Sequence, residues 1–429
     1  MQPKPFIRAY LSTSFCTLGI ALSLSASSVL AQTEPLLTLE HAEQQALGQE
    51  PGREALLAQA DALREQSVVA GQLPDPQLRV GLGNFPIESG GFTTEGMTQA
   101  QLGVRQAFPP GKTRSLGTRQ FEERAIQVSR AADARARDVT TAVRHAWLDT
   151  FYWQQAHDIV SESRPYFADL VTVARSLYSV GRRDQQDVLQ AELELSRLDD
   201  RLIDISRERA RARARLSEWV PSAATQSVGA GLPAWEQMPP LETLIANLAD
   251  HPRLRAAEAA IDARQTGISL AEQQYKPGWA IDLGYGYRDG SLPNGDPRSD
   301  FMSVMVTVDV PLFRAKRQDR AVAAARKERR AATETREQLR RELEARLRSE
   351  FARWQDLTRQ VELYQRTILP QAEDRARAAL LAYQSDSGDF DDVMRGQIDV
   401  MDLRVQWERL KAERAQSFAV LANLGGLTP

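Results

Sequence analysis

Cysteine and histidine are scarce in this chain of 429 residues. It has one cysteine, Cys16, and four histidines. Cys16 lies near the N-terminus, so the rest of the chain has no disulfide, no thiol nucleophile and no thiolate metal site. The histidines show no HExxH spacing, and neither a Walker loop nor a GxSxG turn occurs. We therefore expect no enzyme activity, no cofactor and no stable metal site.

Long apolar helices and an excess of charge of one sign are also missing. Charged residues make up 26% of the chain and the formal net charge is -3, which argues against a nucleic-acid-binding surface. The arginine-rich run from Arg314 to Arg348 is interleaved with glutamates, and we expect it to form a solvated helix face with i,i+4 pairs. After residue 32 no segment is hydrophobic enough to span a bilayer as a helix.

The first 31 residues have the pattern of a secretory signal peptide. Lys4 and Arg8 precede an apolar stretch at residues 15–24, and small residues ending at Ala31 form a cleavage site. Cys16 lacks the flanking residues of a lipidated cysteine, so we expect no lipid anchor. The sequence therefore predicts an exported protein.

The rest of the chain contains one long pattern twice. The stretch PQLRVGLG at residues 76–83 corresponds to PGWAIDLG at residues 277–284, and Val188 corresponds to Val393 at a similar distance. This period is too long for a solenoid repeat. We expect two β-β-α-α repeats at residues 32–219 and 241–429, each with an entry helix, joined by a Pro- and Gly-containing linker at 220–240.

Four short segments alternate between apolar residues and polar residues or glycines. They lie at about 76–84, 98–108, 277–288 and 300–311. This alternation is typical of transmembrane barrel strands, although a half-buried soluble sheet would show it too. Four strands are too few to close a barrel, and open edges in lipid are costly. The pattern thus predicts that several chains contribute strands to one barrel.

Two pairs of helices follow the strands, at about 112–179 and 185–219 and at about 315–384 and 389–424. The first helix of each pair would reach roughly 100 Å at 1.5 Å per residue. The second helices carry apolar residues at heptad spacing, among them Leu198 and Leu403, which predicts paired, coiled-coil helices. A coiled-coil dimer of the ordinary kind is the alternative.

These segments together resemble the TolC-type outer-membrane efflux proteins of Gram-negative bacteria. The likeness rests on LTLEHAEQQALGQEPGREAL, AGQLPDPQLRVGL, QAFPPGKTR and VDVPLFRAKRQDR, in this order. It implies a mixed α and β fold: an outer-membrane β-barrel with four strands per chain, closed by a trimer and continued by a helical periplasmic barrel. It also implies a homotrimer that works with a periplasmic adaptor protein and an RND-type inner-membrane pump.

The resemblance places the periplasmic entrance at the helix tips. Gly181, Asp187 and Gly388 are assigned to the tip turns. The family carries two aspartates three residues apart after the second tip turn; Asp392 matches the first, but Arg395 occupies the second position. Asp389 and Asp391 lie close by and could compensate. Acidic residues at a helix start also stabilise the helix dipole, which is the structural alternative.

The expected substrate rests only on the resemblance of the sequence to one branch of the family. The strand and corner sequences look most like the heavy-metal (cation efflux) branch, so we expect a passive duct for heavy-metal cations. A duct for drugs or other small organic molecules is the first alternative. An exported coiled-coil structural protein or adhesin without a pore is the second.

Overall fold

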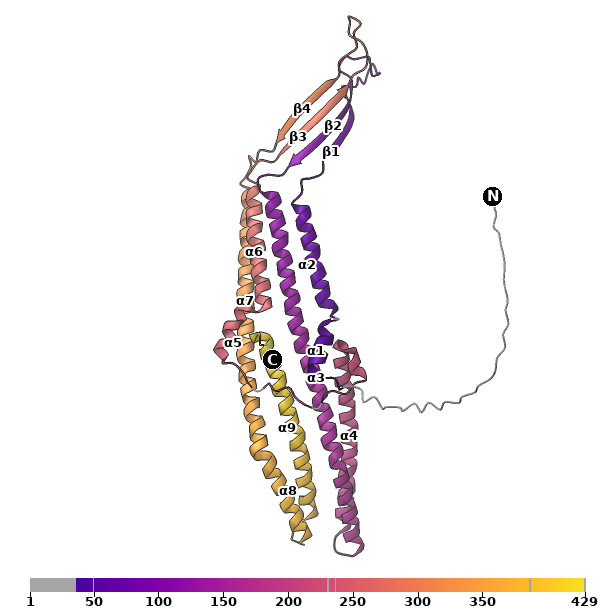
Figure 1. The fold of residues 1–429 in the computed structure, drawn as a ribbon, viewed down its shortest axis with the longest axis vertical. Helices are drawn as coiled ribbons and strands as arrows, with labels where there is room; N and C mark the ends of the chain where they lie inside the picture. Colours follow the sequence, from indigo (N-terminus) through magenta and orange to yellow (C-terminus); the bar gives the residue numbers. More distant parts are fainter. Residues whose placement is uncertain (1–35, 49, 230, 236, 386, 428–429) are drawn as a thin grey trace, which may run out of the picture. The chain divides into compact units, whose positions relative to one another are not determined.

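The computed structural model describes residues 36–427, except residues 49, 230, 236 and 386. The predicted signal peptide, residues 1–31, lies outside this part of the chain. Both repeats contribute strands to one sheet and long helices to one helical layer (Figure 1).

Four antiparallel strands form the sheet, as predicted. They are β1 (Gln77–Gly83), β2 (Gln99–Phe108), β3 (Trp279–Tyr287) and β4 (Phe301–Val308), in the spatial order β1-β2-β3-β4. The pair β2–β3 joins the first repeat to the second. Among the described strands, β1 and β4 each have one neighbour and therefore form the two edges.

The register aligns apolar residues on one face of the sheet. Leu78 pairs with Val104, which pairs with Leu283, which in turn pairs with Val304. These side chains are exposed to a large extent in the single chain. Aromatic residues end this face at both margins: Trp279 stacks on Phe108, while Tyr285 and Tyr287 stand at the far ends of the strands. An apolar band bounded by aromatic residues is typical of a lipid-facing surface.

Polar residues and glycines share the opposite face. The next row of pairs runs Arg79, Gly103, Gly284 and Ser303. Because Gly103 has no side chain, Arg79 on β1 can reach over it to Asp282 on β3, with Nη1 and Oδ1 2.9 Å apart. Charge on this face is compatible with a water-filled interior.

Nine α-helices make up the described helical part. The first repeat has α1 (Leu39–Gly48), α2 (Pro51–Ala70), α3 (Thr113–Ser179) and α4 (Gln185–Trp219), and the second has α5 (Leu241–Asn247), α6 (Pro252–Gln273), α7 (Gln318–Leu363), α8 (Leu369–Gln384) and α9 (Phe390–Gly425). Short 3₁₀ turns occur at Pro221–Ala224 and Leu248–Asp250. Helix α3 packs against α2, α4, α6 and α9, so it connects the two repeats. None of the described helices is both long and apolar enough to cross a membrane.

The two long helices differ where each contains a proline. Helix α3 runs without interruption through Pro165. In the second repeat, a π-helical turn, η3 (Tyr364–Ile368), separates α7 from α8 just before Pro370. Proline has no N–H and its ring crowds the carbonyl four residues earlier, here that of Arg366, and a wider turn relieves this conflict. The expected single helix at about 315–384 is therefore two helices joined by this turn.

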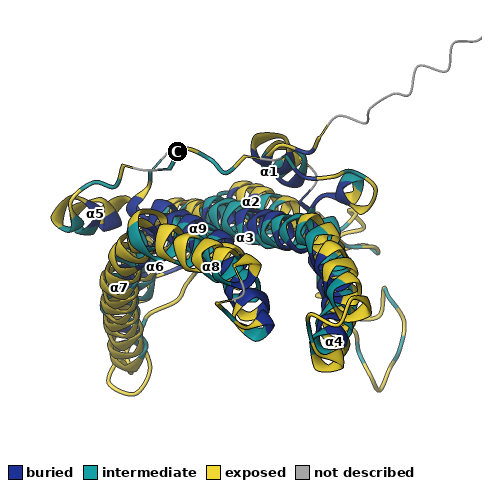
Figure 2. Ribbon diagram, turned by 90° about the horizontal axis from the view of Figure 1, so that it is seen from below, coloured by how far each residue is buried: buried dark blue, intermediate teal, exposed yellow. Residues whose placement is uncertain are grey.

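The core consists of seams between helices rather than one globular centre. In the lower half, Phe167 of α3, Leu198 of α4 and Val393 of α9 are buried in one cluster. Along the predicted heptad positions, Leu198 is buried, whereas Leu403 is only half-buried in the single chain. Helix α7 is mostly exposed, and Figure 2 shows the helices arranged along an open arc.

Candidate functional site at the helix tips

The first tip turn, between α3 and α4, is a Schellman motif. The N–H of Gly181 donates to the carbonyl of Tyr178 (3.0 Å), and the N–H of Arg182 donates to the carbonyl of Leu177 (3.0 Å). Gly181 has φ of +72°, a left-handed conformation that glycine adopts without strain. The predicted role of Gly181 in the turn thus has a clear conformational basis.

The second tip turn, between α8 and α9, closes in a similar way. The N–H of Ser387 donates to the carbonyl of Ala382 (2.9 Å). A Cβ on Gly388 would lie 2.9 Å from the Cβ of Ala382, so this glycine permits a close approach rather than a left-handed turn. The position that corresponds to Gly181 in the second repeat is residue 386, which lies outside the described part of the chain.

Side chains connect the two tips. The guanidinium of Arg183 lies over the ring of Tyr383, 4.4 Å from its centroid, and its Nη2 donates to the Tyr383 carbonyl at 3.4 Å. Slightly further from the tips, Gln190 Nε2 of α4 donates to Asp391 Oδ1 of α9 at 2.5 Å. The contacts of Arg183, Tyr383 and Gln190 are not predictable from the sequence, because no spacing indicates which side chains of the first tip meet those of the second.

The four candidate entrance residues have different surroundings. Asp389 is the N-cap residue of α9 and is exposed. Asp391 forms an ion pair with Arg395, one turn along the same helix, in addition to its bond from Gln190. Asp392 is exposed and makes no hydrogen bond or ion pair with another described residue. Asp391 and Arg395 therefore neutralise each other, whereas Asp389 and Asp392 are both left without a side-chain partner among the described residues.

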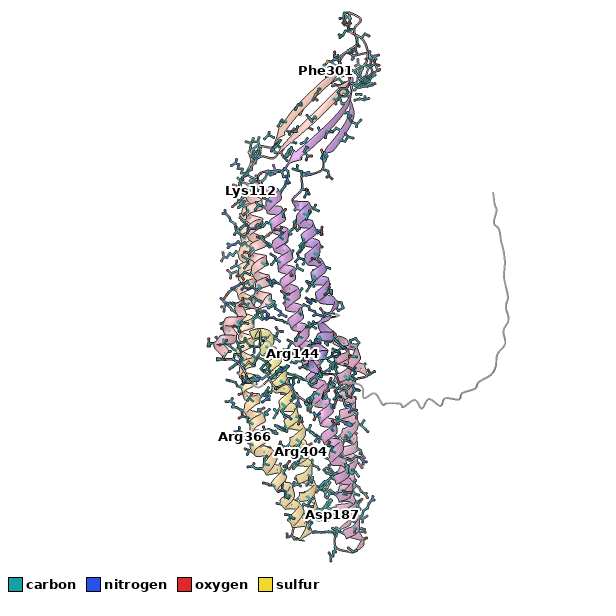
Figure 3. All side chains as sticks on the ribbon, in the orientation of Figure 1. Lys112, Arg144, Asp187, Phe301, Arg366 and Arg404 are labelled. Carbon is teal, nitrogen blue, oxygen red and sulfur yellow. The ribbon has the colours of Figure 1, made fainter. Side chains whose placement is uncertain are left out.

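Asp187 occupies the position in the first repeat that corresponds to Asp392. It lies in the first turn of α4, at the lower end of the helices in Figure 3. It is half-buried, and this burial raises the pKa of its carboxyl, with a smaller contribution in the same direction from Asp184 and Asp389 and an opposing one from Arg183. The two repeats thus hold equivalent aspartates in unlike environments, one partly covered and one open to solvent.

We predict a pH dependence of the first tip that comes from Asp187. The pKa of the Asp187 carboxyl is raised in the folded state, so the folded protein binds the carboxyl proton more tightly than the unfolded chain does. The contribution of Asp187 to stability is therefore present at low pH and is lost as the pH rises through the folded-state pKa. Hydrogen exchange of the tip amides should show protection that decreases from about pH 3 to pH 6, after correction for intrinsic rates. Asp187→Asn should flatten this dependence, and an unchanged slope in the variant would contradict the assignment.

The described residues of the tips form no acidic or histidine cluster suited to a metal ion. Across residues 36–427, with the four omitted positions set aside, no group of three or more His, Cys, Asp or Glu side chains is arranged to hold a metal. The described tip residues therefore offer exposed charge and hydrogen-bonding groups.

Comparison with solved structures identifies the class of fold. The chain is similar to CusC (14% identity, 90% of this chain and 91% of that chain, TM-score 0.76), whose structures concern transmembrane channel formation. It is also similar to the outer membrane protein VceC of Vibrio cholerae (16% identity, 90% and 96%, TM-score 0.74) and to the CmeC outer membrane channel of Campylobacter jejuni (12% identity, 97% and 94%, TM-score 0.74). At these identities the likeness establishes the fold.

A second comparison matches part of the chain to a family. Residues 245–427, which make up most of the second repeat, match the model of the family described as "Outer membrane efflux protein", whereas no curated protein matches the chain. The fold of both repeats is that of the outer membrane channels. Proteins of the matched family are non-enzymatic outer membrane channels of tripartite efflux systems, with a helical extension into the periplasm. The predicted fold, the absence of enzyme activity and the outer-membrane location are thereby confirmed.

Proposed function

We propose that three copies of this chain form the exit duct of a tripartite efflux system. The observation that carries the proposal is the four-stranded sheet with one apolar face and two unpaired edges, β1 and β4. A single copy cannot close a barrel, whereas three copies supply 12 strands when β4 of one copy pairs with β1 of the next. The open arc of helices in Figure 2 would close in the same way.

We further propose that the duct receives its solutes from an RND-type inner-membrane pump through a periplasmic adaptor. The finer proposal is that these solutes are heavy-metal cations. The likeness of the corner sequences to the cation-efflux branch supports it, as does the unpaired negative charge of Asp392 at the tips. A duct for drugs or other organic compounds is the alternative, and Asp392 would then act only on ions.

Planar-bilayer recording tests the channel itself. The purified protein should run as a heat-resistant trimer in detergent and should conduct, with a preference for cations. Multivalent cations added on the periplasmic side should block the current, because three copies of Asp392 around one axis form a carboxylate ring. A protein that inserts without conducting would overturn the duct and favour the structural or adhesin alternative.

Two variants test the role proposed for Asp392. Asp392→Ala should weaken the multivalent block by roughly fivefold to tenfold, as expected when about 1 kcal/mol of attraction is lost. The double variant Asp391→Ala/Arg395→Ala removes a neutral ion pair on the same helix turn and should leave the block nearly unchanged. Asp389→Ala completes the set. If Asp392→Ala keeps the wild-type block, the aspartates serve as turn and cap residues and the constriction lies elsewhere.

A further inference from the structure

The corner between β4 and α7 combines cations that have no carboxylate partner among the described residues with exposed apolar side chains; one of these cations, Arg314, lies over the ring of Tyr275 at 5.9 Å from its centroid. We call this corner the basic corner and define it by Leu312, Phe313, Arg314, Lys316, Arg317 and Arg320. It follows directly on β4, at the margin of the sheet where Trp279 and Val308 pair. Lys112, labelled in Figure 3, marks the same level in the first repeat. The basic corner therefore lies where the apolar sheet face ends and the helices begin.

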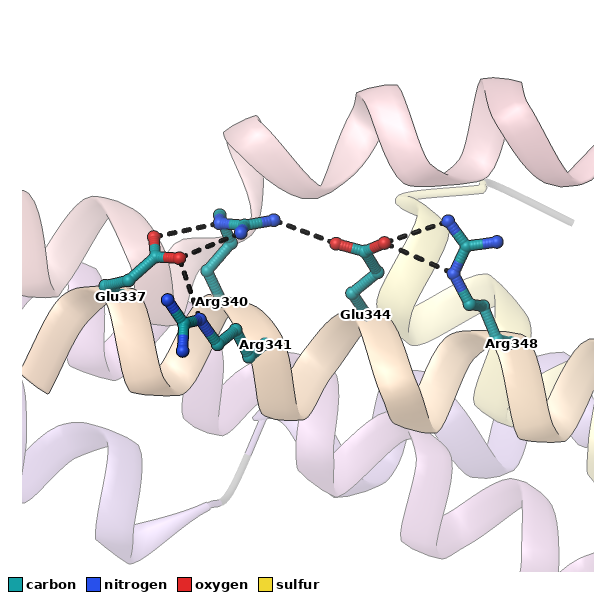
Figure 4. A network of polar contacts seen from close by, with 5 residues as sticks. All are labelled: Glu337, Arg340, Arg341, Glu344 and Arg348. Carbon is teal, nitrogen blue, oxygen red and sulfur yellow. Dashed lines mark hydrogen bonds and ion pairs between the residues drawn. The ribbon is translucent and has the colours of Figure 1, made fainter.

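The cations of the basic corner have no carboxylate partners among the described residues. Further along α7 several arginines are paired: Glu337 binds Arg340 and Arg341, and Glu344 binds Arg340 and Arg348 (Figure 4). In the corner, Arg314 donates to the Pro311 carbonyl at 3.0 Å, and Lys316, Arg317 and Arg320 are exposed and form no ion pair.

The nearby carboxylate does not neutralise these cations. Asp319 accepts a hydrogen bond from the Tyr275 hydroxyl at 2.6 Å and forms no ion pair with them. The stretch from 314 to 320 has four basic residues and one acidic one, whereas Arg326 and Arg330 further along pair with Glu272 and Glu334. Its charge is therefore available to an external anion.

The apolar part of the basic corner is unusually open. Leu312 is 74% exposed and Phe313 is 81% exposed. Val310 and Leu312 continue the even-numbered positions that carry the apolar face of β4. These side chains extend the lipid-facing surface of the sheet toward the helices.

The corresponding corner of the first repeat shows that the turn itself does not require these residues. There Pro110 and Gly111 take the places of Leu312 and Phe313. In that corner the N–H of Lys112 donates to Gln273 Oε1 at 3.0 Å, and Gly111 and Lys112 are exposed. The first corner keeps two cations, Lys112 and Arg114, in the places of Arg314 and Lys316, but has Ser115 and Thr118 in the places of Arg317 and Arg320. A chain can thus make the strand-to-helix corner without an exposed leucine and phenylalanine and with fewer cations.

We propose that the basic corner binds anionic phospholipid of the periplasmic leaflet of the outer membrane. Leu312 and Phe313 would lie at the boundary of the acyl chains, while Arg314, Lys316, Arg317 and Arg320 contact the phosphates. Basic side chains beside a membrane surface attract anionic lipids, and apolar and aromatic side chains favour the interface. The site holds the chain at a fixed depth in the bilayer and is separate from the passage of solutes.

Titration with lipid in mixed micelles tests the site. The purified protein receives phosphatidylglycerol or phosphatidylcholine that carries a fluorescent label, and the apparent Kd of each is measured. The triple variant Arg314→Gln/Lys316→Gln/Arg317→Gln should bind phosphatidylglycerol at least tenfold more weakly, given a factor of about five per cation. Binding of phosphatidylcholine should stay unchanged. The charge-preserving variant Arg314→Lys/Arg317→Lys should retain most of the preference.

A matched control carries the same loss of charge elsewhere on α7. Arg341→Gln/Arg348→Gln/Arg359→Gln removes three exposed arginines that have carboxylate partners in the chain. The apparent Kd of this control variant for phosphatidylglycerol should lie within about twofold of the wild-type value. Phe313→Ser should weaken the binding of both lipids.

Several results would overturn the proposal. Equal losses in the triple variant and the control would mean that net charge alone attracts the lipid. Equal binding of the two lipids by the wild type would mean that no anionic site exists. Dissociation of the oligomer by the triple variant, with lipid preference intact, would mean that a second copy of the chain covers the basic corner.

Discussion

Val306→Arg is expected to cost about 2–4 kcal/mol and to impair insertion into the outer membrane. Val306 lies in the middle of β4, opposite Ile281, and its side chain is 60% exposed on the apolar face. An arginine at the bilayer midplane must be moved out of water, which is the origin of this cost. Fractionation of cells and the yield of heat-resistant oligomer in detergent measure the effect.

Ser303→Arg is the matched control on the same strand. Ser303 faces the polar side of the sheet, where its partner Gly284 leaves room for a longer side chain. Thr307 also lies on the polar side, but its partner Ala280 is buried, so an arginine there would meet more crowding. If Val306→Arg and Ser303→Arg insert equally well, the assignment of the two faces is wrong.

Leu198→Ala is expected to lower the free energy of unfolding by about 2–5 kcal/mol. Leu198 of α4 is 5% exposed and packs in the cluster that joins α3, α4 and α9 near the tips. Removing three carbons there leaves a cavity that neighbouring helices cannot easily fill. Thermal or denaturant unfolding, followed by circular dichroism, reports the loss.

Leu193→Ala provides the comparison within the same helix. Leu193 is 50% exposed in the single chain and is not part of the buried cluster. Its truncation should change stability by less than about 1 kcal/mol. A loss as large as that of Leu198→Ala would show that another copy of the chain covers this side of α4.

The sheet was predictable from the sequence because its two faces meet different surroundings. A period of two with apolar residues on one side fixes which side chains share a face, and shifting the register by one residue would reverse them. The duplicated pattern then fixed the number of strands. The pairing of Leu78, Val104, Leu283 and Val304 in one row across the four strands follows from this constraint.

Contacts between helices were harder to predict from the sequence than the sheet. The heptad pattern indicates a seam but not its partner, so it treats Leu198 and Leu403 alike, although only Leu198 is buried in the single chain. The turn η3 depends on how the helix accommodates Pro370, whereas Pro165 causes no such turn. Neither the stacking of Arg183 on Tyr383 nor the pairing of Asp391 with Arg395 could be distinguished from other charge placements on a helix.

The pairing of β2 with β3 has a consequence for the symmetry of the proposed duct. Because the two repeats join edge to edge in one sheet, the wall of a trimer would consist of six similar hairpin units. Six separate chains would have to present identical residues at every unit. With two units fused in one chain, alternate positions around the wall are free to diverge. The half-buried Asp187 can then alternate with the open Asp392, and a corner built on Pro110 and Gly111 with one that exposes Leu312 and Phe313.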